Sequence, residues 1–359
     1  MAPSSDWSVV RELRAQLPAG VFELRPWRLL WLPVHLAIVG AATFLIATRD
    51  VDFFTPLLSI VIGFSFAGLA FLAHETLHGS VVRRLALRRL VGLVSFAPFC
   101  LSPRLWMAWH NRVHHGHTNV PGSDPDAYPT LTEYENDARA RLMVEVGAPG
   151  LGRFRGLITL LSGLSVQSLH MLIVAQRRGY LPKKQYRIAL AETLSTVVFW
   201  ASIGALIGPL AFLFAFVLPL ALANAVVMAH IVTNHSLSRT GENLDDLDTS
   251  LSVTVPRWFD FYTLGFGYHV EHHMFPAMSG GSAPVVHREL LRRYPERYQV
   301  LPLWRALWLV HRTPRVHTET GRLVDPKTRR SVPTLPRLNR LETGSRPSDP
   351  PPSARLLLT

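Results

Sequence analysis

The sequence predicts an all-α integral membrane protein, in which four transmembrane helices form two hairpins and a cytoplasmic helical cap carries clusters of histidine. Of the 359 residues, 48% are hydrophobic and only 17% are charged, so the chain is too apolar for an ordinary soluble domain. The apolar residues gather in uncharged runs about as long as a bilayer core is thick. The chain also contains 16 histidines but one cysteine, so any metal would have to be bound by nitrogen.

The first hairpin is predicted from two apolar runs, residues 29–47 and 53–73. Each run is close to the ~20 residues that a helix needs to cross a hydrocarbon core of about 30 Å. Arginines precede the first run and follow the second, whereas the link between the runs carries little positive charge. Since Lys and Arg accumulate at the cytoplasmic ends of spanning helices, both ends of this hairpin are expected in the cytoplasm. Residues 1–28 then form a cytoplasmic N-terminal segment.

The second hairpin is predicted where the chain is almost uncharged for a long stretch, between residues 188 and 231. Gly208 and Pro209 interrupt this stretch with a pair of residues that disfavours a continuous helix. The spans are therefore expected at residues 188–207 and 209–231, and the membrane domain as a whole at residues 29–310.

Three further segments are not expected to cross the membrane. Residues 90–101 are too short and are predicted to be re-entrant or interfacial. Residues 157–175 are long enough, but a crossing there would place the basic residues that follow on the outer side, so we predict an interfacial helix, with a fifth span as the alternative. Residues 311–359 are rich in Pro, Arg and Ser and are predicted to form a disordered tail.

Clusters of histidine lie at or near the cytoplasmic ends of these segments. Residues three and four apart share one face of a helix, so the imidazoles of a cluster can meet at one point. Since one first-row metal takes at most about six ligands, nine such histidines predict two metals. Imidazole alone suits zinc or copper equally well, so ligand type does not establish iron. The nine histidines are His74 and His78; His110, His114 and His115; His235; and His269, His272 and His273.

The motifs H-x-x-x-H, H-x-x-x-H-H and H-x-x-H-H, in this order, resemble those of the membrane fatty acid desaturase family over residues 27–276. The stretches HVEHHMFP and HHGHTN are more similar to the acyl-lipid and acyl-CoA desaturases than to the alkane hydroxylases or the carotenoid hydroxylases and ketolases. The resemblance implies two iron ions (Fe2+/Fe3+), O2 as co-substrate, an external electron donor and insertion of a double bond into an acyl chain. It also implies that the ninth ligand comes from the end of the fourth span, where His235 is the better match and His230 the reserve.

Other polar residues near these motifs are candidates for orienting the ligands. Metal-bound imidazoles usually donate their second ring N–H to a carboxylate or another acceptor. No residue beyond the metal ligands is predicted to be catalytic. The orienting candidates are His117, His230, Asn234, Glu75, Glu271, Asp124 and Asp126.

The expected substrate is a fatty acyl chain, carried by a lipid, by coenzyme A or by acyl carrier protein. The sequence has no His-Pro-Gly-Gly haem-binding motif, so we expect a separate electron donor, such as a ferredoxin or a b-type cytochrome with its reductase. The net charge of +12 could suggest nucleic acid, but the arginines flank apolar runs, which favours membrane lipid as the partner and argues against nucleic acid. A bacterial inner membrane is the expected location, with the active site on its cytoplasmic face.

Two alternative functions remain open on the sequence. Hydroxylation or ketone formation on a lipid or carotenoid would use the same metals, and counting ligands does not separate it from desaturation. A histidine-rich metal transporter is more remote, because it would need ionisable residues near the bilayer midplane. The middles of the predicted spans are nearly free of such residues.

Overall fold

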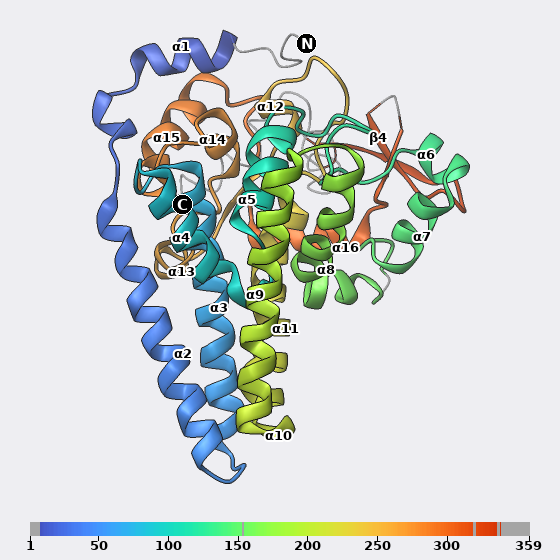
Figure 1. Cartoon of the computed structure of the whole chain (residues 1–359). Helices are drawn as coiled ribbons and strands as arrows, with labels where there is room; N and C mark the ends of the chain where they lie inside the picture. Colours follow the sequence, from blue (N-terminus) through green and yellow to red (C-terminus); the bar gives the residue numbers. More distant parts are fainter. Residues whose placement is uncertain (1–7, 153, 319–320, 336–337, 339–359) are drawn as a thin grey trace. The chain divides into compact units, whose positions relative to one another are not determined.

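The computed structural model describes residues 8–152, 154–318, 321–335 and 338 of the chain (Figure 1). The chain divides into two compact units. Unit 1 consists of Met1–Glu23, Val113–Thr159 and Ala229–Thr359, and unit 2 of Leu24–Arg112 and Leu160–Met228.

Unit 2 begins with the first predicted hairpin. After the short helix η2 (Pro26–Leu30), α2 (Trp31–Thr48) and α3 (Phe54–His78) pack side by side (Figure 1). The imidazole of His35 lies so close to Gly68 that a Cβ atom at Gly68 would come within 2.4 Å of His35 Nε2. The two helices can therefore approach closely only because position 68 has no side chain.

The second predicted hairpin is also present in unit 2. It consists of α9 (Lys183–Ile207) and a returning segment of α10 (Pro209–Phe212), η5 (Leu213–Val217) and α11 (Leu218–Asn234). Gly208 separates the two arms with a φ of +83°, a conformation that side chains disfavour, and Pro209 then starts the returning arm.

A broken helix connects the two hairpins within unit 2. Its first part is α4 (Leu85–Phe96) with η3 (Ala97–Phe99), and its second part is α5 (Pro103–Trp106) with η4 (Met107–His114). The parts meet at an angle of 102°, as in a broken span or a re-entrant loop. Glu192 of α9 holds the break, because its carboxylate accepts from Ser102 Oγ at 2.6 Å and from Arg104 Nε at 2.7 Å.

Within the described residues, five helical segments are long and apolar enough to cross a membrane. Four of them contain the predicted spans, and the fifth is α8 (Gly156–Arg177), which the sequence placed at the interface. Two serines of α8 contact other parts of unit 2. Ser165 pairs with Asn224 of α11, with Ser165 Oγ 3.0 Å from Asn224 Nδ2, and Ser168 Oγ donates to the Cys100 carbonyl at 3.4 Å. Length and composition therefore keep the alternative of a fifth span open.

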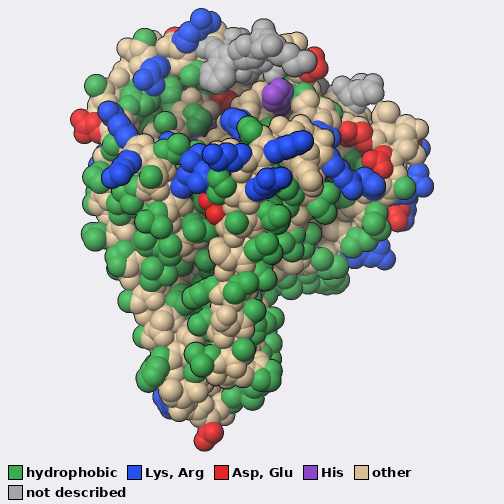
Figure 2. Space-filling model, viewed as in Figure 1, with side chains coloured by type: hydrophobic (Ala, Val, Ile, Leu, Met, Phe, Trp, Pro, Cys, Tyr) green, Lys and Arg blue, Asp and Glu red, His purple; other side chains and the backbone are tan. Residues whose placement is uncertain are grey.

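The surface of unit 2 fits a membrane-spanning role. Figure 2 shows hydrophobic side chains covering the column that α2, α3, α9 and α10 form in Figure 1, with charged side chains at its tip. Exposed apolar side chains on these helices include Phe44, Phe54, Leu57, Leu206 and Leu210. The chain is therefore a multi-pass membrane protein.

Unit 1 has a hydrophobic core built from helices that are distant in sequence. Leu13 of α1 (Ser8–Gln16), Val270 of α14 (His269–Met274) and Leu290 of α15 (Ala283–Arg293) are fully buried together. The strands β1 (Ser252–Thr254) and β2 (Val300–Pro302) pair in parallel beside this core. The remaining helices are η1 (Ala19–Phe22), α6 (Leu131–Asn136), α7 (Ala138–Val146), α12 (Asp246–Thr249), α13 (Arg257–Tyr262), η6 (Gly280–Ser282) and α16 (Leu303–Arg312).

The C-terminal region differs from the disordered tail that the sequence predicted from residue 311. The strands β3 (Val316–His317), β4 (Arg322–Val324) and β5 (Ser331–Pro333) form an antiparallel sheet. Val316 and Val324 of this sheet are buried against Tyr134, which explains why a segment with so few apolar residues is ordered. The last part of the expected tail, residues 339–359, lies outside the described residues.

Candidate metal centre

Two predicted ligands lie at the end of α3. His74 and His78 are one helical turn apart, and their ring centroids are 4.7 Å apart. The helix ends directly after them at Gly79, whose φ of +90° is the usual left-handed conformation of a helix C-cap. This abrupt end keeps both imidazoles on the last turns of α3.

His110 approaches this pair from η4, which has the wider turns of a π-helix. Such turns are rare and often occur at functional sites. The His110 ring lies 5.2 Å from that of His74 and 5.3 Å from that of His78, and it stacks on Trp106 at 4.4 Å. Candidate ligand nitrogens of the three histidines lie within 4.8 Å of one another.

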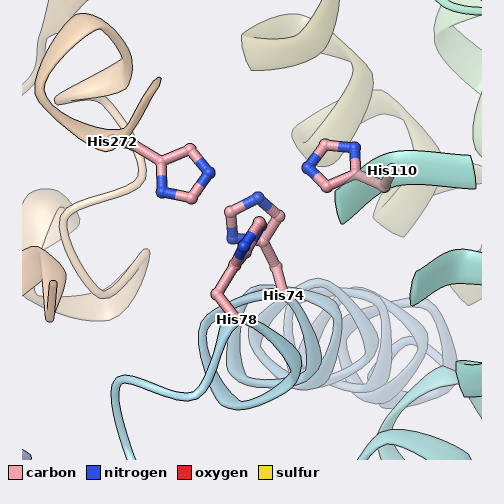
Figure 3. Close-up of side chains that lie close together, drawn as sticks. All are labelled: His74, His78, His110 and His272. Atoms are coloured by element: carbon pink, nitrogen blue, oxygen red, sulfur yellow. The ribbon is translucent and has the colours of Figure 1, made fainter. Parts of the chain in front are cut away.

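Figure 3 shows these three side chains converging, His74 and His78 from α3 and His110 from η4. We call His74, His78 and His110 the first cluster. His272, which Figure 3 also labels, belongs to unit 1.

A second cluster lies in unit 1 and consists of His114, His235, His269 and His273. Candidate ligand nitrogens of the four lie within 4.8 Å of one another, although the residues come from the end of η4, the turn after α11 and one face of α14. All four are at least nine-tenths buried. The second cluster therefore brings together three distant parts of the sequence.

Three rings of the second cluster are held through Nδ1. His114 Nδ1 lies 2.9 Å from the Asp124 carboxylate, and His235 Nδ1 donates to the Thr249 carbonyl at 3.0 Å. Thr118 Oγ1 donates to the His114 carbonyl and lies 3.2 Å from His273 Nδ1, so it accepts from that ring. In each case the bond at Nδ1 leaves Nε2 for another partner.

The second cluster fits a metal ion. His273 Nε2 is buried and has no hydrogen-bond partner within the described part of the chain. His235 Nε2 and His269 Nε2 are only 2.7 Å apart. Burial lowers the pKa of His235 to about 3 and that of His273 well below its usual value, so both rings are neutral near pH 7. Neutral imidazoles directed at one point are the ligands that a transition metal takes.

His115 and His272 lie beside the second cluster. Their Nε2 atoms are 3.2 Å apart, and the His115 ring stacks on His273 with 4.3 Å between centroids. Burial lowers the pKa of His272 to about 3, so this ring is also neutral.

The carboxylates predicted to orient the ligands have different surroundings. Asp124 bonds to His114, and Asp126 has a carboxylate oxygen 3.6 Å from His114 Nδ1. Glu75 instead forms a buried ion pair with Arg28, 2.6 Å from Arg28 Nη1. The Glu271 carboxylate also contacts other groups, which are Ser252 Oγ and Tyr298 OH, both at 2.5 Å, and His287 Nδ1 at 3.0 Å.

The uncharged candidates have the following surroundings. His117 Nδ1 donates to the Val113 carbonyl at 3.2 Å. His230 is fully buried, with its ring centroid 5.7 Å from that of Phe266. Asn234 ends α11, and its carbonyl accepts from Leu251 N at 2.8 Å.

Thr118, Asn119 and Thr249 were not predicted from the sequence. Asn119 Nδ2 lies 3.1 to 3.2 Å from the carbonyls of His235, Arg239 and Thr249, and so ties the loop after His115 to the loop after α11. Its partners are more than a hundred residues away in the chain, so motif spacing does not reveal them. The polar pair Thr118–Asn119 directly after the second motif was the only local signal.

A mainly helical membrane protein with two imidazole clusters, one of them buried throughout, is thus the class that the fold and the site define. The family model described as fatty acid desaturase matches residues 53–304. The chain belongs to the fatty acid desaturase family, which confirms the resemblance seen in its histidine motifs.

Similar proteins with curated names are also desaturases. A Delta 8-(E)-sphingolipid desaturase of Kluyveromyces lactis is 28% identical over 61% of this chain and 43% of its own length. A protein of the same name from Komagataella phaffii is 27% identical over 61% of this chain and 45% of its own. An sn-1 acyl-lipid omega-3 desaturase (ferredoxin) of Synechocystis sp. is 28% identical over 35% of each chain. The matches therefore span less than half the length of these relatives.

Proposed function

We propose that the chain is an O2-dependent desaturase that introduces a C=C double bond into the acyl chain of a lipid. The observation that carries this proposal is the second cluster, in which three of four buried imidazoles are held at Nδ1 with Nε2 left for a metal. Membership of the desaturase family supports the reaction, and the names of the relatives support a lipid-borne acyl chain. Coenzyme A and acyl carrier protein remain the alternative carriers.

We propose that the nine histidines predicted from the sequence hold two iron ions. The first cluster supplies ligands to one iron and the second cluster to the other, with His115 and His272 completing the set. Removal of hydrogen from an unactivated methylene requires redox chemistry with O2. Bound iron supplies this chemistry, whereas zinc lacks it. The chain's own contribution is to keep His235, His272 and His273 neutral, and to orient and bury the rings of the second cluster. Helix η4 links the clusters, because it carries both His110 and His114.

The proposed topology has four spans, with α8 lying along the membrane surface. Arg112 Nη2 donates to the Tyr180 carbonyl at 2.8 Å. These two residues flank the stretch that contains α8, so both ends of that stretch lie on the same side of the membrane. The chain between them must cross an even number of times. Since α8 is the one candidate span among the described residues of that stretch, this bond supports a surface position for α8.

We propose that the histidine-bearing side is cytoplasmic. The basic side chains of unit 2 lie mostly at that end of its helices, as expected for cytoplasmic ends, and they could attract an acidic donor such as a ferredoxin or a b-type cytochrome with its reductase. The name of the Synechocystis relative supports a ferredoxin. A bacterial inner membrane remains the predicted location. These basic residues include Arg83, Arg84, Arg112, Arg177, Arg178, Lys183, Lys184 and Arg187.

Lipid analysis of a host that expresses the chain tests the proposed reaction. The wild-type chain should give an acyl product that has lost two hydrogens, and His273→Ala should abolish it because a ligand is removed. His170→Ala, which changes an exposed histidine of α8, should leave the product unchanged. A product that gains one oxygen would indicate hydroxylation instead. Metal transport by purified protein in vesicles, without O2 uptake, would support the transporter alternative.

A further inference from the structure

The residues directly after His235 are held by the C-terminal part of the chain. We call residues 236–238 the ligand loop. It lies beyond the end of α11, so helical hydrogen bonds do not fix it, and each of its residues is at most 5% exposed. All three of its carbonyls accept a hydrogen bond from C-terminal residues. The donors are Arg315 Nη1 to Ser236 at 3.2 Å, Leu335 N to Leu237 at 2.9 Å and His317 Nε2 to Ser238 at 3.2 Å.

Arg315 joins the ligand loop to the end of α16. Arg315 is 3% exposed, and its Nη2 also donates to the carbonyls of Leu309 at 3.3 Å and Val310 at 2.6 Å. The last carbonyls of a helix have no partner within the helix, and Arg315 supplies a donor to Val310 there. The Leu309 carbonyl also accepts from Thr313 N and Thr313 Oγ1. One side chain thus fixes a helix end and the ligand loop together.

The C-terminal sheet is anchored on a different part of unit 1. Val316 and Val324 pack against Tyr134 of α6, which follows the loop of the second histidine motif. Two ion pairs add to this contact, Arg329 with Glu135 at 2.6 Å and Lys327 with Glu145 at 3.1 Å. The sheet therefore connects α6 and α7 to the ligand loop.

We propose that residues 313–318 and 321–335 form a clamp that positions His235 for metal binding, with Arg315 and His317 as its positioning residues. The segment lies beyond the family match, which ends at residue 304. His235 needs a fixed backbone because its Nδ1 must reach the Thr249 carbonyl while its Nε2 faces the other ligands. The clamp fixes this backbone where secondary structure does not. The inference rests on the proposed metal centre.

Substitutions of His317 test the clamp. His317→Leu removes the donor to Ser238, whereas His317→Gln keeps an amide N–H at a similar reach. Outer residues that orient metal ligands typically contribute roughly 10- to 100-fold to metal affinity, so we expect a loss of that size for His317→Leu and near wild-type affinity for His317→Gln. Arg315→Met should also weaken binding. Arg322→Ala is the matched control, because Arg322 is exposed on β4 and contacts Ser331 of the neighbouring strand.

The measurement is a Co2+ titration of metal-free, full-length protein, followed by ligand-field absorption, which reports coordination geometry. In His317→Leu, we expect one class of site to bind Co2+ more weakly and to change its absorption spectrum, while the other class binds as in the wild type. Arg322→Ala should bind as the wild type does at both classes. The clamp is refuted if His317→Leu and Arg315→Met bind Co2+ as the wild type does, or if His317→Gln is as weak as His317→Leu. A wild-type chain that binds no metal would instead refute the proposed metal centre.

Discussion

At the scale of single residues, the bonds to Nδ1 are what distinguish the second cluster from a chance gathering of histidines. A free imidazole can rotate about its side chain and change tautomer, but a ring held at Nδ1 by a carboxylate, a carbonyl or a hydroxyl directs Nε2 at one point. Asp124 holds both a ring and the surrounding loop, because its carboxylate accepts from His114 Nδ1 and also from the backbone N–H groups of Asn119 and Asp126.

Asp124→Asn should weaken metal binding by the second cluster. The substitution removes the negative charge beside His114, so we expect a loss of roughly 10- to 100-fold in affinity, the range typical of such partners. Asp126→Asn should have a smaller effect, because its carboxylate is 3.6 Å from the same nitrogen. The iron content of purified protein, measured against chelator concentration, checks the order. Equal retention of iron by Asp124→Asn and the wild type would contradict this role.

The histidine clusters could be predicted from the sequence, whereas most of the groups that bond to their rings could not. Spacings of three and four residues bring histidines together within one helix, and this is a local property of the chain. The orienting groups depend on tertiary contacts. Glu75 and Glu271 stand next to ligand histidines in the sequence, yet Glu75 pairs with Arg28 and Glu271 with Ser252, because neighbouring positions on a helix point in different directions.

At the scale of elements, the hairpin of α2 and α3 depends on close packing at one glycine. Gly68→Ala places a Cβ atom within 2.4 Å of His35 Nε2, so His35 or the helices must shift. Overpacking of this kind typically costs about 1–3 kcal/mol, and we expect a lower temperature of thermal unfolding. Gly40→Ala in α2 is the matched control, because nothing lies within 4 Å of its added Cβ atom. A similar decrease in both variants would contradict the packing explanation.

The elements also show where sequence patterns are informative. Long uncharged runs predict the two hairpins, because a bilayer demands continuous apolar helices. The strands β3 to β5 are two or three residues long and contain Arg, Ser and Pro, so their composition resembles that of a disordered tail. Their order depends on Tyr134, far earlier in the chain, and on the carbonyls of the ligand loop. No local pattern records such contacts.

At the scale of the whole molecule, the number of spans decides whether the histidine motifs can act together. With α8 on the surface, α9 crosses away from the side of His110, and the returning arm that ends in α11 crosses back. His235, which follows α11, then lies on the same side as His110. If α8 crossed as well, the chain would have five spans, and His235 and the third motif would lie on the opposite side from His74 and His78. A shared metal centre requires the first topology, which the bond between Arg112 and Tyr180 supports.

Accessibility of single cysteines to a membrane-impermeant thiol reagent distinguishes the two topologies. In a Cys100→Ser background, Asp50→Cys in the link between α2 and α3 should react in intact cells, whereas Arg178→Cys after α8 and Glu242→Cys after α11 should react only once the membrane is opened. All three positions are exposed, so differences in labelling report the side of the membrane rather than burial. Labelling of Arg178→Cys together with Asp50→Cys in intact cells would mean that α8 crosses. His235, His269 and His273 would then lie on the opposite face from His114 and the first cluster, and a joint di-iron centre would be impossible.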